Sequence, residues 1–325
     1  MAAALKIGIV GAGIAGLACA TRLKSEGCDV VLFDKGKRPG GRLSTLHLDD
    51  LTWDFGCQYV EPGDGAFAAQ IADWRRSGLI AEWPDGPEGA LVGVPAMSSL
   101  IAAQCGEHDV RFGALVQRIE HRGQDWFVRG PGLNDGPFAA LVIAIPSEQA
   151  APLLSLHDLD MAREAASARS RPCWTVMAAF AEPLPGLPAF LRDRGAIAWA
   201  ARNNSKPGRG PAECWVIQAG PEWSQQALEA DREEVAIQLL ALFAAEAGQA
   251  LPEPIFLKAH RWRFSLSYGQ HGEALWNPEL RLGACGDWCM GPQVEGAWRS
   301  GSELADKVIA MWQADVSERP LLAAK

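Results

Sequence analysis

Three glycines near the start of the chain have the spacing of a phosphate-binding turn. Gly11, Gly13 and Gly16 form the pattern G-x-G-x-x-G between an apolar segment, residues 5–10, and a helix expected over residues 14–26. In such a turn the first glycine allows a tight bend, the second lets a pyrophosphate approach the backbone, and the third permits close packing of helix and strand. The free N–H groups of the helix N-terminus would face the phosphates.

An acidic residue follows at the expected distance. Asp34 lies 18 residues after Gly16, at the end of a second expected strand over residues 29–33. Its carboxylate can accept hydrogen bonds from a ribose diol. The strand–helix–strand opening therefore predicts a dinucleotide-binding α/β fold, but it does not separate NAD from FAD.

A second glycine loop favours FAD. Gly40 and Gly41 follow the second strand and precede Arg42. The glycines give access to the backbone, and the Arg42 guanidinium can bridge cofactor phosphates. The alternative interpretation is a surface turn with a solvated arginine.

The end of the chain offers a second anchor. Gly286 and Asp287 follow a short apolar strand, and a helix is expected to begin near Val294. Asp287 can bind ribityl hydroxyls, and the helix N-terminus can face the flavin N1–C2=O edge, which gains negative charge on reduction. Because NAD needs no such anchor, this segment also favours FAD, whereas an ordinary strand–loop–helix is the alternative.

Composition excludes several classes. The net charge of -9 gives no attraction to nucleic acid or to an anionic membrane. The eight cysteines contain no Cys-x-x-Cys pair, so we expect buried thiols, no metal site and a reducing, cytoplasmic location. The apolar N-terminal run is interrupted by glycines and is too short to span a bilayer.

The order of the expected elements predicts an α/β protein with two domains. Short apolar strands in the middle of the chain, with an amphipathic helix over residues 231–247, indicate a separate sheet. The predicted division gives residues 1–80, 96–150 and 277–315 to a discontinuous Rossmann-type FAD domain, residues 81–95 and 151–276 to an α+β substrate domain of mixed sheet and helices, and residues 316–325 to a loose tail.

Several stretches together resemble a known family, the renalase-type flavoproteins, which are a bacterial branch of the amine-oxidase-like FAD superfamily. The matching stretches are LFDKGKRPGGRLST, DFGCQYV, VIAIP, CWTVMAAFAEPL, WAARNNSKPGR, CWVIQAGPEWS, HRWRF and GDWCMGPQVEGAWRSG. They run in order over nearly the whole chain. Two positions depart from the pattern: Gln293 stands where an Arg is expected, and Cys57 where the superfamily usually has Ala.

The resemblance implies a noncovalent FAD with the glutathione-reductase-like fold. It also implies hydride transfer from a small-molecule substrate to the flavin and then to O2. Renalases oxidise dihydronicotinamide dinucleotides reduced at unproductive ring positions and release hydrogen peroxide. An amine oxidase, and a flavin-dependent isomerase or flavin-binding sensor without net turnover, are the alternatives.

The cofactor-binding residues expected from these patterns span both ends of the chain. They are Gly11, Gly13, Ile14, Ala15, Gly16, Asp34, Lys35, Gly41, Arg42, Gln58, Tyr59, Val116, Gly286, Asp287, Val294, Gly296 and Ala297.

The substrate side is expected to be aromatic. Trp288, Trp199, Trp276 and Tyr59 could form walls above the flavin, on which a planar nicotinamide would stack. The alternative is that they are ordinary core residues. We assign Trp288 and Tyr59, together with His260, to the catalytic site.

Strand alternation places Lys258, His260 and Trp262 on one face and Arg261 and Arg263 on the other. His260 is the preferred pocket residue, with a structural hydrogen-bonding histidine as the alternative. Lys258 lies near the region where amine oxidases carry a lysine at flavin N5, but a solvated surface lysine is the alternative.

A polar loop over residues 202–209 completes the expected substrate site. Its Asn204, Lys206 and Arg209 could bind the phosphates of a dinucleotide substrate. The alternative is a solvated hairpin loop.

Overall fold

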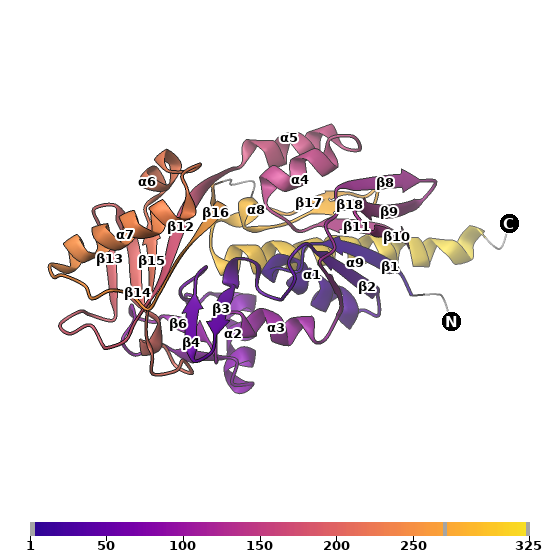
Figure 1. Cartoon of the computed structure of the whole chain (residues 1–325). Helices are drawn as coiled ribbons and strands as arrows, with labels where there is room; N and C mark the ends of the chain where they lie inside the picture. Colours follow the sequence, from indigo (N-terminus) through magenta and orange to yellow (C-terminus); the bar gives the residue numbers. More distant parts are fainter. Residues whose placement is uncertain (1–3, 269–271, 323–325) are drawn as a thin grey trace. The chain divides into compact units, whose positions relative to one another are not determined.

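The computed structural model describes residues 4–268 and 272–322, and the chain folds into two units (Figure 1). Unit 1 contains Met1–Gly41, Ala103–Arg169 and Ser267–Lys325, and unit 2 contains Arg42–Ala102 and Ser170–Leu266. Each unit has a hydrophobic core of its own.

Unit 1 is built on a six-stranded sheet with the order β17-β18-β11-β1-β2-β7. The strands are β1 (Lys6–Val10), β2 (Asp29–Asp34), β7 (Asp109–Phe112), β11 (Ala140–Ile143), β17 (Leu275–Asn277) and β18 (Leu282–Ala284). All pairs are parallel except β17 with β18. The inner strands are almost continuously apolar because parallel strands are covered on both faces.

Two helices from opposite ends of the chain pack together in unit 1. They are α1 (Ile14–Ser25) and α9 (Val294–Leu322). A Cβ atom at Gly301 of α9 would lie 2.0 Å from the Ala15 carbonyl oxygen, so only glycine permits this approach. The predicted loose tail is wrong for residues 316–322, which continue α9. Residues 311–319 contain no glycine or proline that would end the helix before Pro320. The rest of the predicted tail lies outside the described residues.

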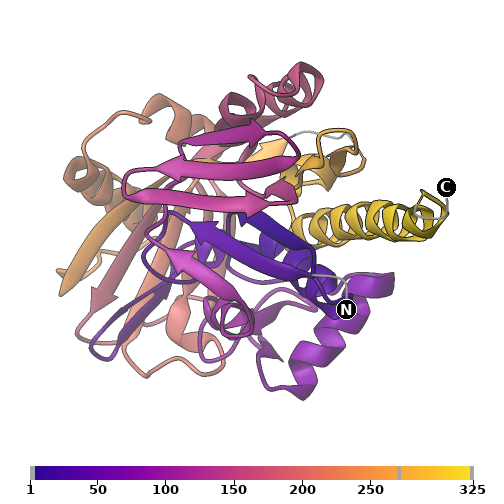
Figure 2. The same ribbon diagram turned by 90° about the vertical axis from the view of Figure 1, so that its right-hand side faces the viewer.

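A three-stranded antiparallel sheet also belongs to unit 1 and faces the viewer in Figure 2. Its strands are β8 (Arg118–Arg122), β9 (Asp125–Gly130) and β10 (Leu133–Phe138). Gly113, with a φ of +71°, separates β7 from β8. Trp126 and Phe138 of this sheet are fully buried in the core of unit 1.

Three further helices complete unit 1. They are α4 (Ser147–Leu154), α5 (Leu159–Ser167) and α8 (Asp287–Met290). Leu154 of α4 and Ala165 of α5 are buried in the unit 1 core. Residues 151–169 therefore belong to unit 1, whereas the sequence placed them in the substrate domain.

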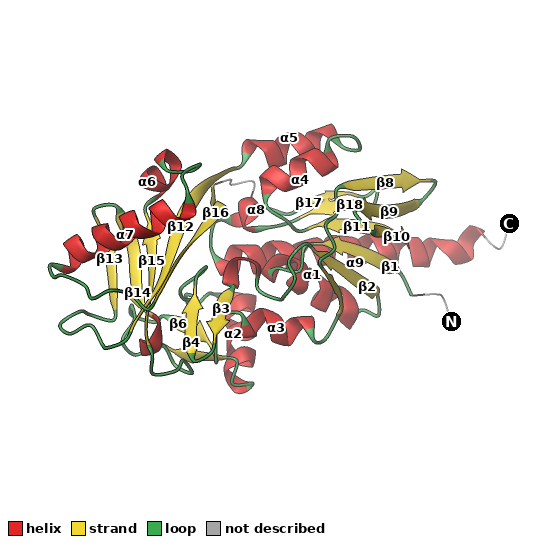
Figure 3. Ribbon diagram, viewed as in Figure 1, coloured by secondary structure: helices red, strands yellow, loops and turns green. Residues whose placement is uncertain are grey.

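Unit 2 is built on a five-stranded sheet with the order β13-β14-β15-β12-β16. The strands are β12 (Arg169–Phe180), β13 (Phe190–Arg194), β14 (Ile197–Arg202), β15 (Glu213–Ala219) and β16 (Phe256–Tyr268). Helix α7 (Arg232–Ala247) lies along one face (Figure 3), where Val235, Leu239 and Phe243 pack against the sheet. The separate middle sheet and its helix are thus confirmed.

Residues 42–102 belong to unit 2 and not to the FAD domain predicted for residues 1–80 and 96–150. Their elements are β3 (Thr45–Leu48), β4 (Leu51–Asp54), α2 (Gly65–Arg76), β5 (Ile80–Glu82), β6 (Leu91–Gly93) and most of α3 (Ser99–Cys105), and α6 (Pro221–Gln226) lies later in the same unit. Trp53 explains the assignment: it packs against Met177 and Val216, and its Nε1 donates to the Ala178 carbonyl at 2.8 Å.

Seven of the eight cysteines are buried, as predicted. Within residues 4–268 and 272–322, no helix combines the length and the apolar character needed to cross a membrane.

Candidate functional site

The glycine turn between β1 and α1 contains two glycines that the fold requires and one that it does not. Gly11 has a φ of +106°, and a Cβ atom there would lie 2.3 Å from the Ala144 carbonyl oxygen. A Cβ atom at Gly16 would lie 2.0 Å from the Gly11 carbonyl oxygen. At Gly13, by contrast, the backbone is extended and no atom lies within 4 Å of a Cβ position. Gly13 therefore borders open space, as expected of a glycine that admits a ligand.

The second glycine loop lies opposite Gly13. A Cβ atom at Gly41, whose φ is +54°, would lie 3.8 Å from the Gly13 Cα atom. Gly13 is also the N-cap of α1, and no side chain caps this helix. The N–H groups of Ile14, Ala15 and Gly16 thus form an uncapped helix N-terminus, which favours a phosphate.

Asp34 fixes the geometry of this turn. Its carboxylate accepts hydrogen bonds from the backbone N–H of Ala12 at 2.9 Å and of Gly36 at 2.7 Å. A carboxylate has about four acceptor positions, so a ribose diol can still bind to it. Its neighbour Lys35 is exposed and donates to the Gln149 side chain at 3.2 Å. The cofactor contact of Lys35 stays a prediction.

The C-terminal anchor begins where β18 ends. Gly286 has a φ of +159°, and Asp287 is almost completely buried at the start of α8. Trp288 is fully buried in the unit 1 core, and its Nε1 donates to the Ile145 carbonyl at 3.1 Å. The predicted catalytic role of Trp288 in a flavin-facing wall is therefore corrected to a core role.

Helix α9 starts at Val294, as predicted, and Gly296 is required by packing within the protein, while its cofactor contact stays a prediction. A Cβ atom at Gly296 would lie 2.5 Å from the Gly291 carbonyl oxygen, so the protein itself requires this glycine. Ser300, one turn further, donates to the Gly286 carbonyl and accepts from its N–H, both at 2.9 Å. The start of α9 and the Gly286 turn are therefore held together. The predicted cofactor contacts of Ala297 and Val116, both largely buried, stay predictions.

These residues of unit 1 fit an FAD cofactor. The space at Gly13 and Gly41 and the uncapped α1 N-terminus match a pyrophosphate, and Asp34 matches a ribose.

Arg42 opens unit 2 directly after Gly41. Its Nη1 donates to the Ser265 carbonyl at 3.0 Å, and its own carbonyl accepts from the Cys57 N–H at 2.8 Å. A Cβ atom at Gly56 would lie 2.1 Å from the Arg42 carbonyl oxygen. The Gly56–Cys57 turn therefore lies against the residue that follows the glycine loop. Whether Arg42 also bridges phosphates stays a prediction.

The prediction that Lys206 and Arg209 bind substrate phosphates is wrong, because it assumed that both side chains are exposed. Both side chains are buried, with exposed fractions of 0% and 1%, and both pair with Asp54, which is itself fully buried. Lys206 Nζ lies 3.3 Å and Arg209 Nη2 lies 2.5 Å from Asp54 Oδ2. A buried, paired cation cannot reach a substrate phosphate in solvent.

Asn204 and Gln58 also have structural partners in unit 2. The Asn204 side chain donates to Glu213 and accepts from the Cys214 N–H, both at 3.3 Å. The Gln58 amide donates to the Gly56 carbonyl at 2.9 Å and accepts from Lys206 Nζ at 3.1 Å. The side chain of Asn204 is therefore used to hold the loop, and Gln58 can offer mainly its backbone to a cofactor.

Sequence reasoning missed Asp54, which organises this region. Its carboxylate accepts from Thr45 Oγ1 at 2.7 Å and from the Met97 N–H at 3.0 Å, in addition to the two cations. Burial alone would raise the pKa of Asp54, but the charges of Lys206 and Arg209 and the Met97 hydrogen bond lower it to about 2. The sequence signal that could have identified Asp54 is its position as an acidic residue at the end of an apolar strand.

Two of the four aromatic residues that were predicted to line the substrate site, Tyr59 and Trp199, lie together in unit 2. The rings of Tyr59 and Trp199 are 5.5 Å apart, and Phe190 stacks on Trp199 at 5.1 Å with an angle of 11°. Arg192 donates to Tyr59 Oη at 2.6 Å, and its guanidinium lies 5.1 Å from the Trp199 ring. Trp199 Nε1 is buried without a hydrogen-bond partner. Trp276 belongs to unit 1.

Trp276 and Trp288 were predicted to share a wall with these rings. Trp276 lies on β17, opposite Gly283 of β18, and a Cβ atom at Gly283 would lie 3.0 Å from its indole. Gly283 thus makes room for Trp276 within unit 1. The substrate contact of Trp276 stays a prediction.

His260 lies on β16 among aromatic rings. Its imidazole is 4.9 Å from the Phe55 ring and 4.4 Å from the Trp262 ring. Burial, with smaller effects of Arg232 and Lys258, lowers the pKa of His260 to about 4, so the ring is neutral at pH 7. The predicted face of β16 is confirmed for His260 and Trp262, and Lys258 is exposed.

The prediction that Arg261 and Arg263 lie on the opposite face of β16 is also confirmed, because both side chains pair with the same carboxylate. Arg261 and Arg263 both pair with Glu229, at 2.9 Å and 2.6 Å.

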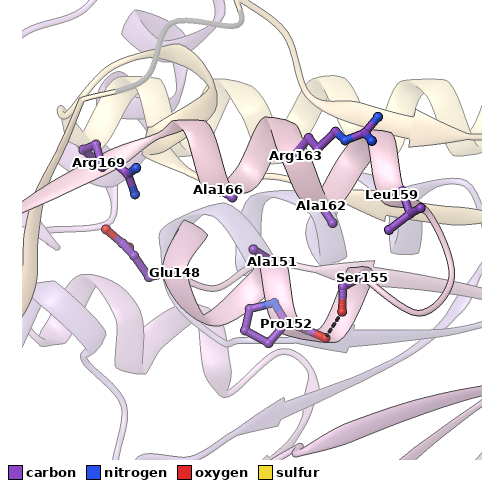
Figure 4. Close-up of a pocket in the computed structure, with 9 residues that line it drawn as sticks. All are labelled: Glu148, Ala151, Pro152, Ser155, Leu159, Ala162, Arg163, Ala166 and Arg169. Atoms are coloured by element: carbon purple, nitrogen blue, oxygen red, sulfur yellow. Dashed lines mark hydrogen bonds between the residues drawn. The ribbon is translucent and has the colours of Figure 1, made fainter.

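A groove of about 410 Å³ lies between α4 and α5 of unit 1 (Figure 4). Its lining residues are Glu148, Ala151, Pro152, Ser155, Leu159, Ala162, Arg163, Ala166 and Arg169. None of them is a predicted site residue. In the part of the chain that the structure describes, no cluster of three or more His, Cys, Asp or Glu side chains could hold a metal ion.

Comparison with known sequences supports this cofactor geometry. Residues 9–73 match the model of an NAD(P)-binding Rossmann-like domain, and residues 73–309 match that of flavin containing amine oxidoreductases. A zeta-carotene-forming phytoene desaturase of Myxococcus xanthus is 51% identical over 51 residues, which are 16% of this chain and 10% of that protein. The chain thus aligns with about a tenth of that relative.

Solved structures share the fold over almost the whole chain. A putative protoporphyrinogen oxidase from Exiguobacterium has a TM-score of 0.74 at 14% identity, with 94% of this chain and 99% of that chain covered. Cyclohexylamine oxidase from Brevibacterium oxydans has a TM-score of 0.73 at 13% identity, with 96% and 100% covered. The match to flavin containing amine oxidoreductases spans residues 73–309, which are most of the chain, and it therefore establishes the family. The chain belongs to the flavin-containing amine oxidoreductase family.

Proposed function

We propose that this protein is a renalase-like oxidase of dihydronicotinamide dinucleotides reduced at unproductive ring positions. Bound FAD supplies the redox chemistry, in which the dihydronicotinamide, a proton and O2 become the oxidised nicotinamide and H2O2. The proposal assigns the aromatic cluster of unit 2 to the substrate site. This cluster consists of Tyr59, Phe190, Trp199 and Trp83, whose ring centroid lies 6.4 Å from that of Trp199.

The charge on this cluster is the observation that carries the proposal. Arg192 lies 5.1 Å from the Trp199 ring, and Lys206 Nζ lies 5.3 Å from the Trp83 ring. Two cations against aromatic rings disfavour a protonated amine by like-charge repulsion. They favour a planar, neutral ring whose dinucleotide carries phosphates. Arg192 is exposed and can meet those phosphates, whereas Lys206 is buried and acts only through its field.

The state of His260 agrees with this substrate. A dihydropyridine already carries a transferable hydride, and its nitrogen lone pair stabilises the cation that remains, so no general base is needed. His260 is neutral at pH 7 and packs between Phe55 and Trp262. Its expected role is to orient the ring and exclude water.

Oxidation of an amine is the second candidate function, and the match of residues 73–309 to the amine oxidoreductase family favours it. An amine must be neutral before it can donate hydride. Such a site would have to hold the neutral amine beside Arg192, whose positive charge also disfavours amine protonation. The two candidates therefore differ in the substrate and not in the cofactor.

Anaerobic stopped-flow mixing separates the two candidates. The oxidised holoenzyme is mixed with borohydride-generated isomers of reduced NAD or with a panel of primary amines, and flavin absorbance is followed. We expect rapid bleaching by the isomers and not by ordinary NADH, the matched control. Fast bleaching by amines with none by the isomers would replace this proposal with the amine-oxidase function.

Two variants test the assigned residues in the same assay. Arg192→Gln is expected to raise the substrate concentration for half-maximal reduction while the limiting rate changes little. His260→Ala is expected to lower the limiting rate by about 10–100-fold, less than the loss of a full general base. Complete loss of reduction in His260→Ala would show that the histidine is the essential base.

A further inference from the structure

The indole N–H of Trp199 differs from other buried indole donors. It is buried and makes no hydrogen bond in the part of the chain that the structure describes. An indole N–H can only donate, and a buried donor without an acceptor is costly. Trp126, Trp174 and Trp215 avoid this cost, because their Nε1 atoms donate at 2.7, 2.9 and 2.8 Å. An acceptor supplied by a ligand would satisfy Trp199 in the same way.

The strand pairing of unit 2 places an acceptor next to this donor. Trp199 of β14 lies directly opposite Gln218 of β15, and the Cβ atoms of such antiparallel partners are about 4.5–5.5 Å apart. Gln218 Nε2 donates to the Gly56 carbonyl at 2.8 Å. Because a carbonyl can only accept, this bond fixes the orientation of the amide and leaves Oε1 on its other side. Among the described residues, no donor bonds to Oε1.

Both side chains lie on the face of the sheet that is turned away from α7. Ile217 of β15 and Ala200 of β14 pack in the core beneath α7. Strand alternation therefore turns Gln218 and Trp199 to the other face. The rings of the aromatic cluster surround Trp199 there. The donor and the acceptor are thus neighbours within one aromatic site of unit 2.

The side chains that surround the Trp199 indole are themselves partly exposed. Arg192, its partner on β13, is exposed, and its guanidinium lies 5.1 Å from the indole ring. Tyr59 and Phe190, whose rings lie 5.5 and 5.1 Å from it, are half-buried. Rotation of these surface side chains gives a ligand access without opening the sheet. Lys206 differs, because it would have to leave a buried carboxylate.

A primary carboxamide on a planar ring complements this pair of groups. Its carbonyl oxygen can accept from Trp199 Nε1, and its NH2 group can donate to Gln218 Oε1. The ring that carries it can stack on the aromatic side chains of the cluster. A protonated amine has no acceptor for the indole, and a carboxylate has no donor for the glutamine. The two groups together therefore favour a carboxamide.

We propose that Trp199 and Gln218 are the specificity-determining residues that bind the carboxamide of a nicotinamide ring. The inference rests on the part of the proposed function that assigns the aromatic cluster to the substrate site. All of the contacts that support it lie within unit 2. The pair takes no part in hydride transfer and decides only which ring is bound.

Calorimetric titration of the oxidised holoenzyme with NAD+ and with its 3-acetylpyridine analogue tests the pair. The analogue keeps the carbonyl but carries a methyl group in place of NH2, so it loses only the contact with Gln218. The unpaired Oε1 atom should make its binding about tenfold weaker than that of NAD+. Equal affinities of the parent protein for the two ligands would overturn the proposal, as would absence of NAD+ binding.

Two variants should give different patterns in the same titration. Gln218→Leu should bind NAD+ as weakly as the analogue, with an unchanged affinity for the analogue. Trp199→Phe should weaken the binding of both ligands about tenfold and keep the preference for NAD+. Gln225→Leu is the matched control, because it removes an exposed glutamine from the same unit and should behave as the parent protein does. Equal weakening of both ligands by Gln218→Leu would indicate a merely structural role and overturn the proposal.

Neither ligand can reduce the flavin, so the titration is independent of the proposed reaction. The expected binding pattern without bleaching by the reduced isomers would reject the oxidase reaction and support the carboxamide pair. Bleaching by the isomers, with equal affinities for the two titrated ligands, would reject the pair and support the reaction. The ratio of affinities in the parent protein needs no variant, so the test holds even if a variant does not fold.

Discussion

Gly13→Val should remove FAD binding while leaving the protein folded. The backbone at Gly13 is extended, with φ and ψ of -81° and -175°, and no atom lies within 4 Å of a Cβ position. Loss of a favourable N-cap residue costs about 1 kcal/mol. Restriction of the unfolded chain contributes about 0.4–1 kcal/mol in the opposite direction. The free energy of unfolding of the apoprotein should therefore change by less than about 1 kcal/mol.

The effect on the cofactor should be much larger. A side chain in this space would displace the pyrophosphate from the N–H groups of α1. Loss of two hydrogen bonds to a charged group, at about 1.5–3 kcal/mol each, amounts to about 3–6 kcal/mol. This corresponds to about a 10²–10⁴-fold loss of FAD affinity.

Calorimetric titration of the apoprotein with FAD and urea unfolding of the apoprotein measure the two quantities separately. Gly16→Ala is the matched control, because its Cβ would lie 2.0 Å from the Gly11 carbonyl oxygen and should destabilise the fold itself. Parental FAD affinity in Gly13→Val would refute the assignment of the open space to the cofactor. So would a variant that loses stability as Gly16→Ala does.

Three further predictions concern other parts of the protein. Asp34→Ala should lower both FAD affinity and apoprotein stability, each by about 1–3 kcal/mol, because two backbone hydrogen bonds are lost with the ribose contact; an effect on affinity alone would contradict this. Gly296→Val should lower the thermal midpoint of the apoprotein, since its Cβ would lie 2.5 Å from the Gly291 carbonyl; an unchanged midpoint would show that only the cofactor constrains this glycine. Burial lowers the pKa of Lys206 from 10.5 to about 8. Between these pH values Lys206 is therefore protonated in the unfolded chain and neutral in the folded chain. Stability in urea should therefore rise between about pH 8 and 10.5, and this rise should be absent in Lys206→Met.

Sequence reasoning succeeded where function depends on local backbone geometry. The turn at Gly11 and Gly16 and the acceptor at Asp34 follow from spacing along one strand–helix–strand unit. The two faces of β16 follow from strand alternation, which His260 and Arg261 obey. Each of these features needs only a few neighbouring residues to be specified.

It failed where the decisive partner is distant in the sequence. Lys206 looks like an exposed loop cation until Asp54, 152 positions earlier, is placed beside it. Trp288 follows Asp287, the aspartate predicted to bind the flavin, but its indole lies in the core and donates to the Ile145 carbonyl. Long-range pairing of this kind leaves no local pattern in one sequence.

The packing of α9 on α1 has a consequence for biosynthesis. The first 41 residues reach their partner helix only after residues 42–293, which include all of unit 2, have been synthesised. At about 5–20 residues per second, this delay is roughly 13–50 s. During that time the face of α1 that receives Gly301 has no partner helix. All residues of unit 2 are therefore available to fold before α9 can cover this face of α1.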